Sequence, residues 1–180
     1  MRIILGSHRG KRLYPPAGLP VRPTTDMAKE SLFNILWNYI DFETVRVLDL
    51  FAGTGNIALE FASRGAKEVV TVESHARCHQ YIRETAAELG FSNLRAVRAD
   101  VFAFLKHAGF PFDIIFADPP YEMKEISLLP ELILRGGWLT QGGFLILEHG
   151  KKVDFSAIPG FFDTRRYGKV HFTFFRQDAQ

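Results

Sequence analysis

The chain has 180 residues, of which 47% are hydrophobic and 23% are charged, values typical of a globular protein rather than a disordered or fibrous one. Its single cysteine, Cys78, excludes a disulfide within the chain and a cysteine-rich zinc site. No apolar run approaches the roughly 18 residues of a membrane-spanning helix, and the start lacks the pattern of a signal peptide. We therefore expect a cytoplasmic protein without a membrane partner, folded as one domain over residues 1–180.

The basic residues are concentrated near the N-terminus. Residues 1–25 carry a net charge of +5 and no acid, so that the rest of the chain must carry −3 to give the overall charge of +2. A basic arm on a mildly acidic body is typical of a protein whose arm meets a polyanion. A solvated basic surface is the alternative that charge alone leaves open.

Residues 1–40 are expected to form an extension in front of the main body. Residues 1–24 contain two short β-like pieces, "RIILG" and "KRLY", followed by the loop "PPAGLPVRPTT", which is dense in proline and glycine. Thr24, Thr25 and Asp26 are candidate N-caps of a helix over residues 25–40, in which apolar residues recur at helical spacing. We expect this helix to pack on a core of residues 45–180.

From residue 45 onward, strand-like and helix-like segments alternate. Strands are predicted at 45–52, 68–73, 94–99, 112–118 and 143–149, with helical patterns between them. This alternation predicts a parallel α/β sheet with helices on both faces. Residues 163–168 and 169–176 have the pattern of two further strands joined at Gly168, which predicts a C-terminal antiparallel hairpin and seven strands in all.

The first strand leads into "DLFAGTGN", Asp49 to Asn56. Gly53 and Gly55 allow a tight turn and close backbone approach, and the next helix offers free N–H groups. Ligands of open α/β sheets bind beyond the carboxyl ends of the strands, so this loop is a candidate cofactor site. With Ala58 the pattern is G-x-G-x-x-A, for which an ordinary strand-to-helix turn is an equal alternative.

Acidic residues follow the second and third strands. Glu73 could accept hydrogen bonds from ribose hydroxyls, and Asp100 could accept one from an adenine amino group. The alternatives are an exposed acid near a helix start for Glu73 and a helix N-cap for Asp100. Because the carboxyl ends of parallel strands share one edge of a sheet, these acids should form an arc there. Their joint occurrence favours a binding site over the separate alternatives.

The fourth strand is followed by "DPPY", Asp118 to Tyr121, a rigid turn because two prolines fix two φ angles. An exocyclic amino group of a nucleobase is a poor nucleophile, since its lone pair is delocalised into the ring. The carboxylate of Asp118 and the carbonyl of Pro119 could accept its N–H bonds and free that lone pair to attack a methyl group. Tyr121 could stack on the base. A proline turn with a buried tyrosine is the alternative, but it gives Asp118 no purpose.

Together these residues resemble a known family. "VLDLFAGTG", Glu73, Asp100 and "DPPY" look like the class I S-adenosylmethionine-dependent methyltransferases that modify amino groups. The N-terminal "GSHRGKRLYPP" and "RPTTDMAKESLFNIL" are similar to the RsmD family, bacterial enzymes that methylate N2 of a guanine in small-subunit (16S) ribosomal RNA. The resemblance covers essentially the whole chain and implies a Rossmann-like class I methyltransferase fold.

The resemblance also implies a cofactor, a partner and a set of roles. S-adenosyl-L-methionine would be the cofactor, and ribosomal RNA or an assembling small ribosomal subunit the partner. Met27 stands where family members often carry a basic residue, which leaves one RNA contact open. The catalytic residues would be Asp118, Pro119, Pro120 and Tyr121. The cofactor-binding residues would be Asp49, Phe51, Gly53, Gly55, Glu73, Asp100 and Val101, and the RNA-binding residues Arg9, Lys11, Arg12 and Arg22.

Three other functions stay open. An NAD-dependent oxidoreductase would use the glycine loop and Glu73, but would leave the DPPY turn and the basic arm unexplained. A non-catalytic RNA-binding protein on the same fold would have no need of Asp118. A DNA adenine-N6 or cytosine-N4 methyltransferase usually adds a target-recognition region, for which 180 residues leave little room. No metal is expected, because His75 and His79 stand four residues apart without a third ligand.

Overall fold

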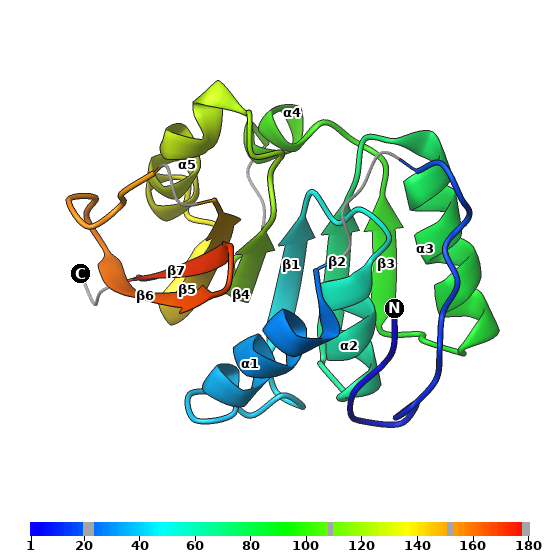
Figure 1. Cartoon of the computed structure of the whole chain (residues 1–180). Coiled ribbons are helices and arrows are strands. Elements are labelled where there is room, and N and C mark those ends of the chain that lie inside the picture. The colour runs from blue at the N-terminus through cyan, green and yellow to red at the C-terminus, as the bar shows by residue number, and fades with distance from the viewer. Residues whose placement is uncertain (20–23, 108–109, 151–152, 178–180) are drawn as a thin grey trace.

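The computed structural model describes residues 1–19, 24–107, 110–150 and 153–177, and one seven-stranded sheet runs through its centre (Figure 1). The strands lie in the order β3-β2-β1-β4-β5-β7-β6. They are β1 Arg46–Leu50, β2 Glu68–Val72, β3 Leu94–Val97, β4 Phe112–Ala117, β5 Leu139–His149, β6 Phe161–Tyr167 and β7 Val170–Arg176. The helices are α1 Asp26–Leu36, α2 Asn56–Ser63, α3 Ala76–Glu88, α4 Val101–Leu105 and α5 Leu129–Arg135, with a 3-10 helix, η1, at Lys124–Leu128.

The sheet is mostly parallel. Strands β1 to β5 pair in parallel, whereas β7 pairs antiparallel with both β5 and β6. The predicted α/β fold, with a mostly parallel seven-stranded sheet and a C-terminal antiparallel hairpin, is therefore confirmed. Strand β1 has β2 on one side and β4 on the other, so the strand order reverses at β1. In open α/β sheets, ligands bind at such a reversal.

Most predicted bounds agree to within two residues at each end, and two elements differ by four residues at one end. The N-terminal helix, expected over 25–40, ends at Leu36, and the chain turns back through a bond from the Tyr39 amide to the Leu36 carbonyl. The fifth strand, expected from residue 143, begins at Leu139, because that residue already pairs with Phe112 of β4. A bulge between Phe112 and Ile114 separates this early pair from the regular ladder, so the alternation of residues along β5 could not indicate it.

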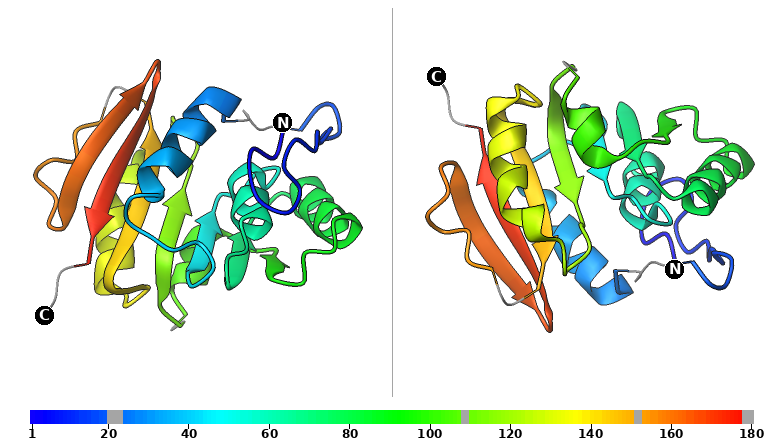
Figure 2. Two further views of the ribbon diagram at one scale, coloured as in Figure 1. Left: turned by 90° about the horizontal axis from the view of Figure 1, so that it is seen from below. Right: turned by 90° about the horizontal axis from the view of Figure 1, so that it is seen from above.

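Helices cover both faces of the sheet, as expected. Helices α1, α2 and α3 contribute to one apolar layer, which includes Val47 and Ile146 of the strands. Helices α4 and α5 pack on the other layer, with Leu48 and Leu147, and Figure 2 shows α2 and α5 on opposite sides of the sheet. Consecutive residues of the central strands thus alternate between two buried layers, which is why β1, β2 and β4 are mostly apolar. Within the described ranges, no helix has the length and apolar character needed to cross a membrane.

The N-terminal arm, residues 1–19, lies beside α2 and α3 (Figures 1 and 2). The two β-like pieces meet in a single antiparallel bridge between Arg2 and Arg12 rather than in regular strands. The Ser7 amide donates to the Ser63 carbonyl, 2.7 Å away, at the end of α2. Gly6 is required at this contact, since its φ is +89° and a Cβ there would lie 1.9 Å from the Ser63 oxygen.

A buried ion pair ties the arm to the main body. Lys29 of α1 is only 1% exposed, and its Nζ lies 3.3 Å from Oε2 of Glu60, which is fully buried in α2. The same Nζ donates to the Arg2 carbonyl at 2.6 Å and to Oδ1 of Asn56 at 2.9 Å. The Glu60 carboxylate also accepts hydrogen bonds from the backbone N–H groups of Ile4 and Leu5, at 2.8 and 3.0 Å. Every donor of this cluster therefore has an acceptor, as a buried charge requires.

Candidate active site

Four acidic side chains mark the ends of neighbouring strands on one face of the sheet; we call them the carboxyl row: Asp49, Glu73, Asp118 and Glu148. Asp49 and Glu148 stand two residues after Val47 and Ile146 and therefore point to the same face as these residues, the face covered by α1 and α2. The Asp118 amide donates to the carbonyl of Leu50 at 3.3 Å, which extends the β1–β4 ladder by one residue. The row thus crosses the point where the strand order reverses.

The glycine loop between β1 and α2 has an unusual backbone. Phe51, Gly53 and Gly55 have φ angles of 59°, 54° and 75°, so the chain turns sharply in the left-handed region. Oδ2 of Asp49 accepts a bond from the Ala58 amide at 3.1 Å and so holds the first turn of α2. A Cβ on Gly55 would lie 3.0 Å from Cγ1 of Ile82, so the loop also packs closely on α3.

Glu73 closes this loop from the neighbouring strand. Its Oε2 accepts a bond from the Gly53 amide at 2.8 Å, and its Oε1 accepts one from the His75 amide at 2.7 Å. Both bonds hold the carboxylate, which is 8% exposed, against the loop. Asp49, Phe51, Gly53, Gly55 and Glu73 are therefore brought together, as the sequence predicted.

Asp100 and Val101 lie at the next strand, β3. Asp100 is exposed and serves as the N-cap of α4, where its Oδ1 accepts a bond from the Ala103 amide at 2.9 Å. Val101 is buried in the apolar layer under α4. The N-cap, which the sequence left open as an alternative, is thus observed, and one carboxylate can fill this role and still accept a bond from a ligand.

The DPPY turn follows β4. Pro119 is buried and Pro120 is exposed, and the Pro120 carbonyl accepts a bond from the Met123 amide at 2.9 Å. Tyr121 is 45% exposed, and its hydroxyl donates to Oε1 of Glu148 at 3.3 Å. An exposed ring face with an anchored hydroxyl is suited to stacking on a planar ligand.

The carboxyl row is electrostatically strained. Burial, with the nearby charges of Glu73 and Glu148, raises the pKa of Asp49 to about 8. Burial likewise raises the pKa of Glu148 to about 7, and the pKa of Asp118 is raised well above its ordinary value by burial and then by Glu148 and Asp49. A positively charged ligand would relieve this repulsion, because it stabilises the ionised carboxylates.

Comparison with known proteins identifies the family. The family described as "Conserved hypothetical protein 95" matches residues 1–176, nearly the whole chain. The "Ribosomal RNA small subunit methyltransferase D" of Escherichia coli K12 is 31% identical over 183 residues, covering 100% of this chain and 91% of that protein. The chain belongs to this family, the RsmD family.

Two further relatives agree with the assignment to the RsmD family. The "Putative rRNA methyltransferase YlbH" of Bacillus subtilis strain 168 is 34% identical and covers 89% of this chain and 88% of that protein. A solved structure of the "Putative methyltransferase yhhF from Escherichia coli" superimposes with a TM-score of 0.87 at 30% identity, covering 100% and 99% of the two chains. The methyltransferase fold that the sequence implied is therefore confirmed.

Two side chains that contact the DPPY turn or its bonded neighbour, Glu148 and Thr24, were not singled out by the sequence as candidate site residues. Glu148, 3% exposed, also accepts a bond through Oε2 from the hydroxyl of Thr24 at 3.3 Å. Thr24 had been considered only as a helix cap, whereas Thr25 fills that role by accepting from the Ala28 amide. A signal for Glu148 was present, since a carboxylate ends the otherwise apolar run "FLIL". Its two hydroxyl partners could not be found from the sequence.

The basic residues of the arm lie away from the carboxyl row. Arg9 is exposed in the turn that contacts the end of α2, and Lys11 pairs with Glu88 at the end of α3, 3.4 Å away. Both helices run opposite to the strands, so these ends lie at the amino edge of the sheet (Figure 1). Arg12 is also exposed, and Arg22 lies outside the described residues. Exposed cations near the carboxyl edge, which the sequence analysis did not single out, are Arg77, Arg98 and Lys124.

Proposed function

We propose that this protein transfers a methyl group from S-adenosylmethionine to the N2 amino group of a guanine in 16S ribosomal RNA. The observation that carries the proposal is the position of Asp118, which follows β4 directly beside the glycine loop of β1, at the reversal of strand order. The RsmD-family relatives, with "rRNA methyltransferase" in their names, support RNA as the substrate. A ribosomal substrate also implies the bacterial cytoplasm as the place of action.

The residues around the glycine loop fit such a cofactor. Gly53 and Gly55 put no side chain between the loop backbone and a ligand, and the repulsion within the carboxyl row favours a cationic ligand such as a sulfonium. Nδ1 of His75, beside Glu73, is buried and has no hydrogen-bond partner within the described part of the chain, which provides a further polar atom for a ligand. We assign Asp49, Phe51, Gly53 and Gly55 to the methionine part, Glu73 to the ribose, and Asp100 with Val101 to the adenine.

The DPPY turn would prepare the target amino group. S-adenosylmethionine supplies an electrophilic methyl group on a positively charged sulfur. The Asp118 carboxylate and the Pro119 carbonyl accept the two N–H bonds, so that the nitrogen becomes pyramidal and its lone pair is released from the ring. Pro120 holds that carbonyl in place, and Tyr121 stacks on the base. After transfer, the carboxylate of Asp118 can take the proton that the methylated nitrogen loses.

Among the alternatives, membership of a methyltransferase family argues against the NAD-dependent oxidoreductase. A DNA amino-methyltransferase shares the same turn, and a non-catalytic RNA-binding protein could share the fold. Both are separated from the proposal by a direct assay. The protein is given labelled S-adenosylmethionine with unmodified small-subunit RNA, free or in particles, and with DNA, and the products are digested to nucleosides.

Label in N2-methylguanosine is the expected result, and comparison of particles with free RNA then identifies the substrate. Label in an adenine or cytosine of DNA would keep the chemistry of the DPPY turn but overturn the assignment of guanine. No label from a protein that demonstrably binds the cofactor would favour the non-catalytic alternative. A variant with Asp118 replaced by asparagine serves as the negative control in each arm.

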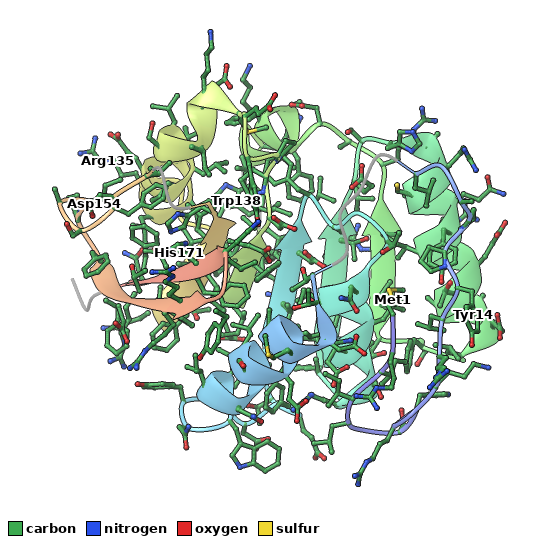
Figure 3. The ribbon with its side chains drawn as sticks, viewed as in Figure 1. Met1, Tyr14, Arg135, Trp138, Asp154 and His171 are labelled. Carbon is green, nitrogen blue, oxygen red and sulfur yellow. The ribbon has the colours of Figure 1, made fainter. Side chains whose placement is uncertain are left out.

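We expect the arm to contact RNA phosphates at a distance from the target base. The substitution Arg12→Ala should weaken RNA binding and make the dependence of log Kd on log salt less steep by about one, because one fewer counterion is released. Arg135→Ala is the matched control, since Arg135 is an exposed arginine on the opposite side of the molecule from the arm residue Tyr14 (Figure 3). A salt dependence unchanged by Arg12→Ala but altered by Lys124→Ala would move the RNA to the carboxyl edge.

A further inference from the structure

Glu148 is a buried acid to which the proposed chemistry gives no task. It is the last residue but one of β5 and is 3% exposed, and its carboxylate accepts hydrogen bonds from the hydroxyls of Tyr121 and Thr24. Burying a carboxylate is costly unless its oxygens are satisfied. Two neutral hydroxyls compensate only part of that cost, so the position carries a penalty that a structural residue would not require.

The register of the sheet places Glu148 beside the catalytic turn. Ala117 of β4 pairs with Leu147 of β5, so the residues that follow them, Asp118 and Glu148, are neighbours on adjacent strands. Both point to the face covered by α1 and α2, because they stand two residues after Phe116 and Ile146. Two carboxyl groups in such neighbouring positions repel each other when both are ionised.

Glu148 also connects the DPPY turn to the entrance of α1. Through Thr24 it reaches the residue just before the N-cap of that helix, and the Thr24 carbonyl accepts a bond from Nδ2 of Asn56 at 3.0 Å. Asn56 is the first residue of α2, directly after the glycine loop. The Glu148 carboxyl group therefore contacts both the DPPY turn and a segment that is bonded to the residue after the glycine loop.

We infer that Glu148 is a positioning residue for methyl transfer: it holds Tyr121 through the phenolic hydroxyl and, as the neighbour of Asp118, sets the pH at which that carboxyl group is ionised. The inference rests on the proposed function. At low pH the two carboxyl groups retain a proton, and Asp118 can accept the amino N–H only after that proton has left. The rate of transfer should therefore fall on the acid side with an apparent pKa that belongs to the pair.

The other groups around the pair are few. Asp49 of β1 adds a negative charge that raises the pKa of Asp118, and hydrogen bonds from Thr24 and Tyr121 lower the pKa of Glu148. His149, the next residue, points to the opposite face, where it contacts Phe155 and the Thr173 hydroxyl. Lys29 reaches this region only through Asn56. No cation among the described residues forms an ion pair with Glu148 or Asp118.

The test is single-turnover methyl transfer to unmodified small-subunit RNA at saturating S-adenosylmethionine, measured from pH 5.5 to pH 9 for the wild type and three variants. Glu148→Gln should slow transfer at high pH by about tenfold, the equivalent of one hydrogen bond. It should also shift the acid limb to lower pH by about one unit, because the charge that raises the pKa of Asp118 is gone. Tyr121→Phe should slow transfer by a similar factor but move the acid limb to higher pH, the opposite direction to Glu148→Gln, because it removes a hydroxyl that lowers the pKa of Glu148.

Thr24→Val provides a second line if Glu148→Gln does not fold, as thermal unfolding and cofactor affinity will show. Removing the hydroxyl that stabilises the ionised Glu148 should move the acid limb to higher pH. If a folded Glu148→Gln variant shows wild-type rates and an unmoved acid limb, the inference about Glu148 is overturned while the proposed function stands. If Glu148→Gln does not fold, the same result in Thr24→Val overturns the inference. A wild-type protein that binds cofactor but transfers no label would refute the proposed function, and the inference with it.

Discussion

Replacing Asp118 by asparagine should lower the rate of methyl transfer by about a hundredfold to a thousandfold, which corresponds to roughly 3 to 4 kcal/mol of transition-state stabilisation. The asparagine keeps the size of the side chain but replaces one acceptor oxygen by an NH₂ donor that opposes the target amino group. Replacement by alanine removes both oxygens of the Asp118 carboxylate and should abolish transfer. Cofactor affinity should stay within about threefold of the wild-type value, because the glycine loop and Glu73 are untouched.

The measurement pairs single-turnover rates with calorimetric titration of S-adenosylmethionine. Asp154→Asn is the matched control, since Asp154 is exposed in the loop between β5 and β6 (Figure 3) and should leave both quantities unchanged. If cofactor affinity collapsed together with the rate in Asp118→Asn, the carboxylate would belong to the cofactor site and not to the target amine. The same substitution removes a charge from the row, so a modest gain in thermal stability would agree with the raised pKa of Asp118.

Replacing Lys29 by methionine should lower the free energy of unfolding by about 3 kcal/mol, because it leaves the buried Glu60 carboxylate with one cation fewer. Glu60 keeps the guanidinium of Arg64, whose Nε lies 2.9 Å from its Oε1, and this partner limits the loss. The Arg2 carbonyl and Asn56 would lose a donor at the same time. The arm should therefore loosen from α2 before the sheet unfolds.

Urea denaturation of Lys29→Met, Glu60→Gln and the double variant measures the coupling. The double variant should cost about 1 to 3 kcal/mol less than the sum of the single variants, because the unpaired charge is absent from it. Lys67→Met, at an exposed position, should change stability by no more than about 0.5 kcal/mol. Strictly additive costs would show that Lys29 and Glu60 do not stabilise each other and that the arm is held by its backbone bonds alone.

Much of the fold was predictable because its signals are local. Parallel strands such as "EVVTVE" and "FDIIFAD" are short, mostly apolar runs that end at an acid, and "DTRRYG" with "KVHFTFFR" joined at Gly168 indicated the hairpin. Such patterns depend only on the period of side chains along a strand or helix. The early start of β5 at Leu139 was missed, because it depends on pairing with Phe112 across a bulge.

The candidate site was predictable in part for the same reason. Gly53, Gly55 and Glu73 stand next to strand ends, and the carboxyl ends of parallel strands must share one edge. Their gathering in the structure follows from chain order alone. The basic arm was different: its charge could be counted in the sequence, but its turn at Arg9 lies at the amino edge because Ser7 bonds to Ser63 at the far end of α2.

The sequence by itself determined the fold class, the family and the residues of the glycine loop and the DPPY turn, because these follow from periodicity and from short motifs. Only the tertiary structure decided which side chains outside the motifs complete them. Glu148 meets Thr24 across 124 positions of the chain, and Lys29 meets Asn56 across 27. Contacts of that kind arise when the sheet register and helix packing bring distant residues together, and nothing in the residues beside them in the chain records it.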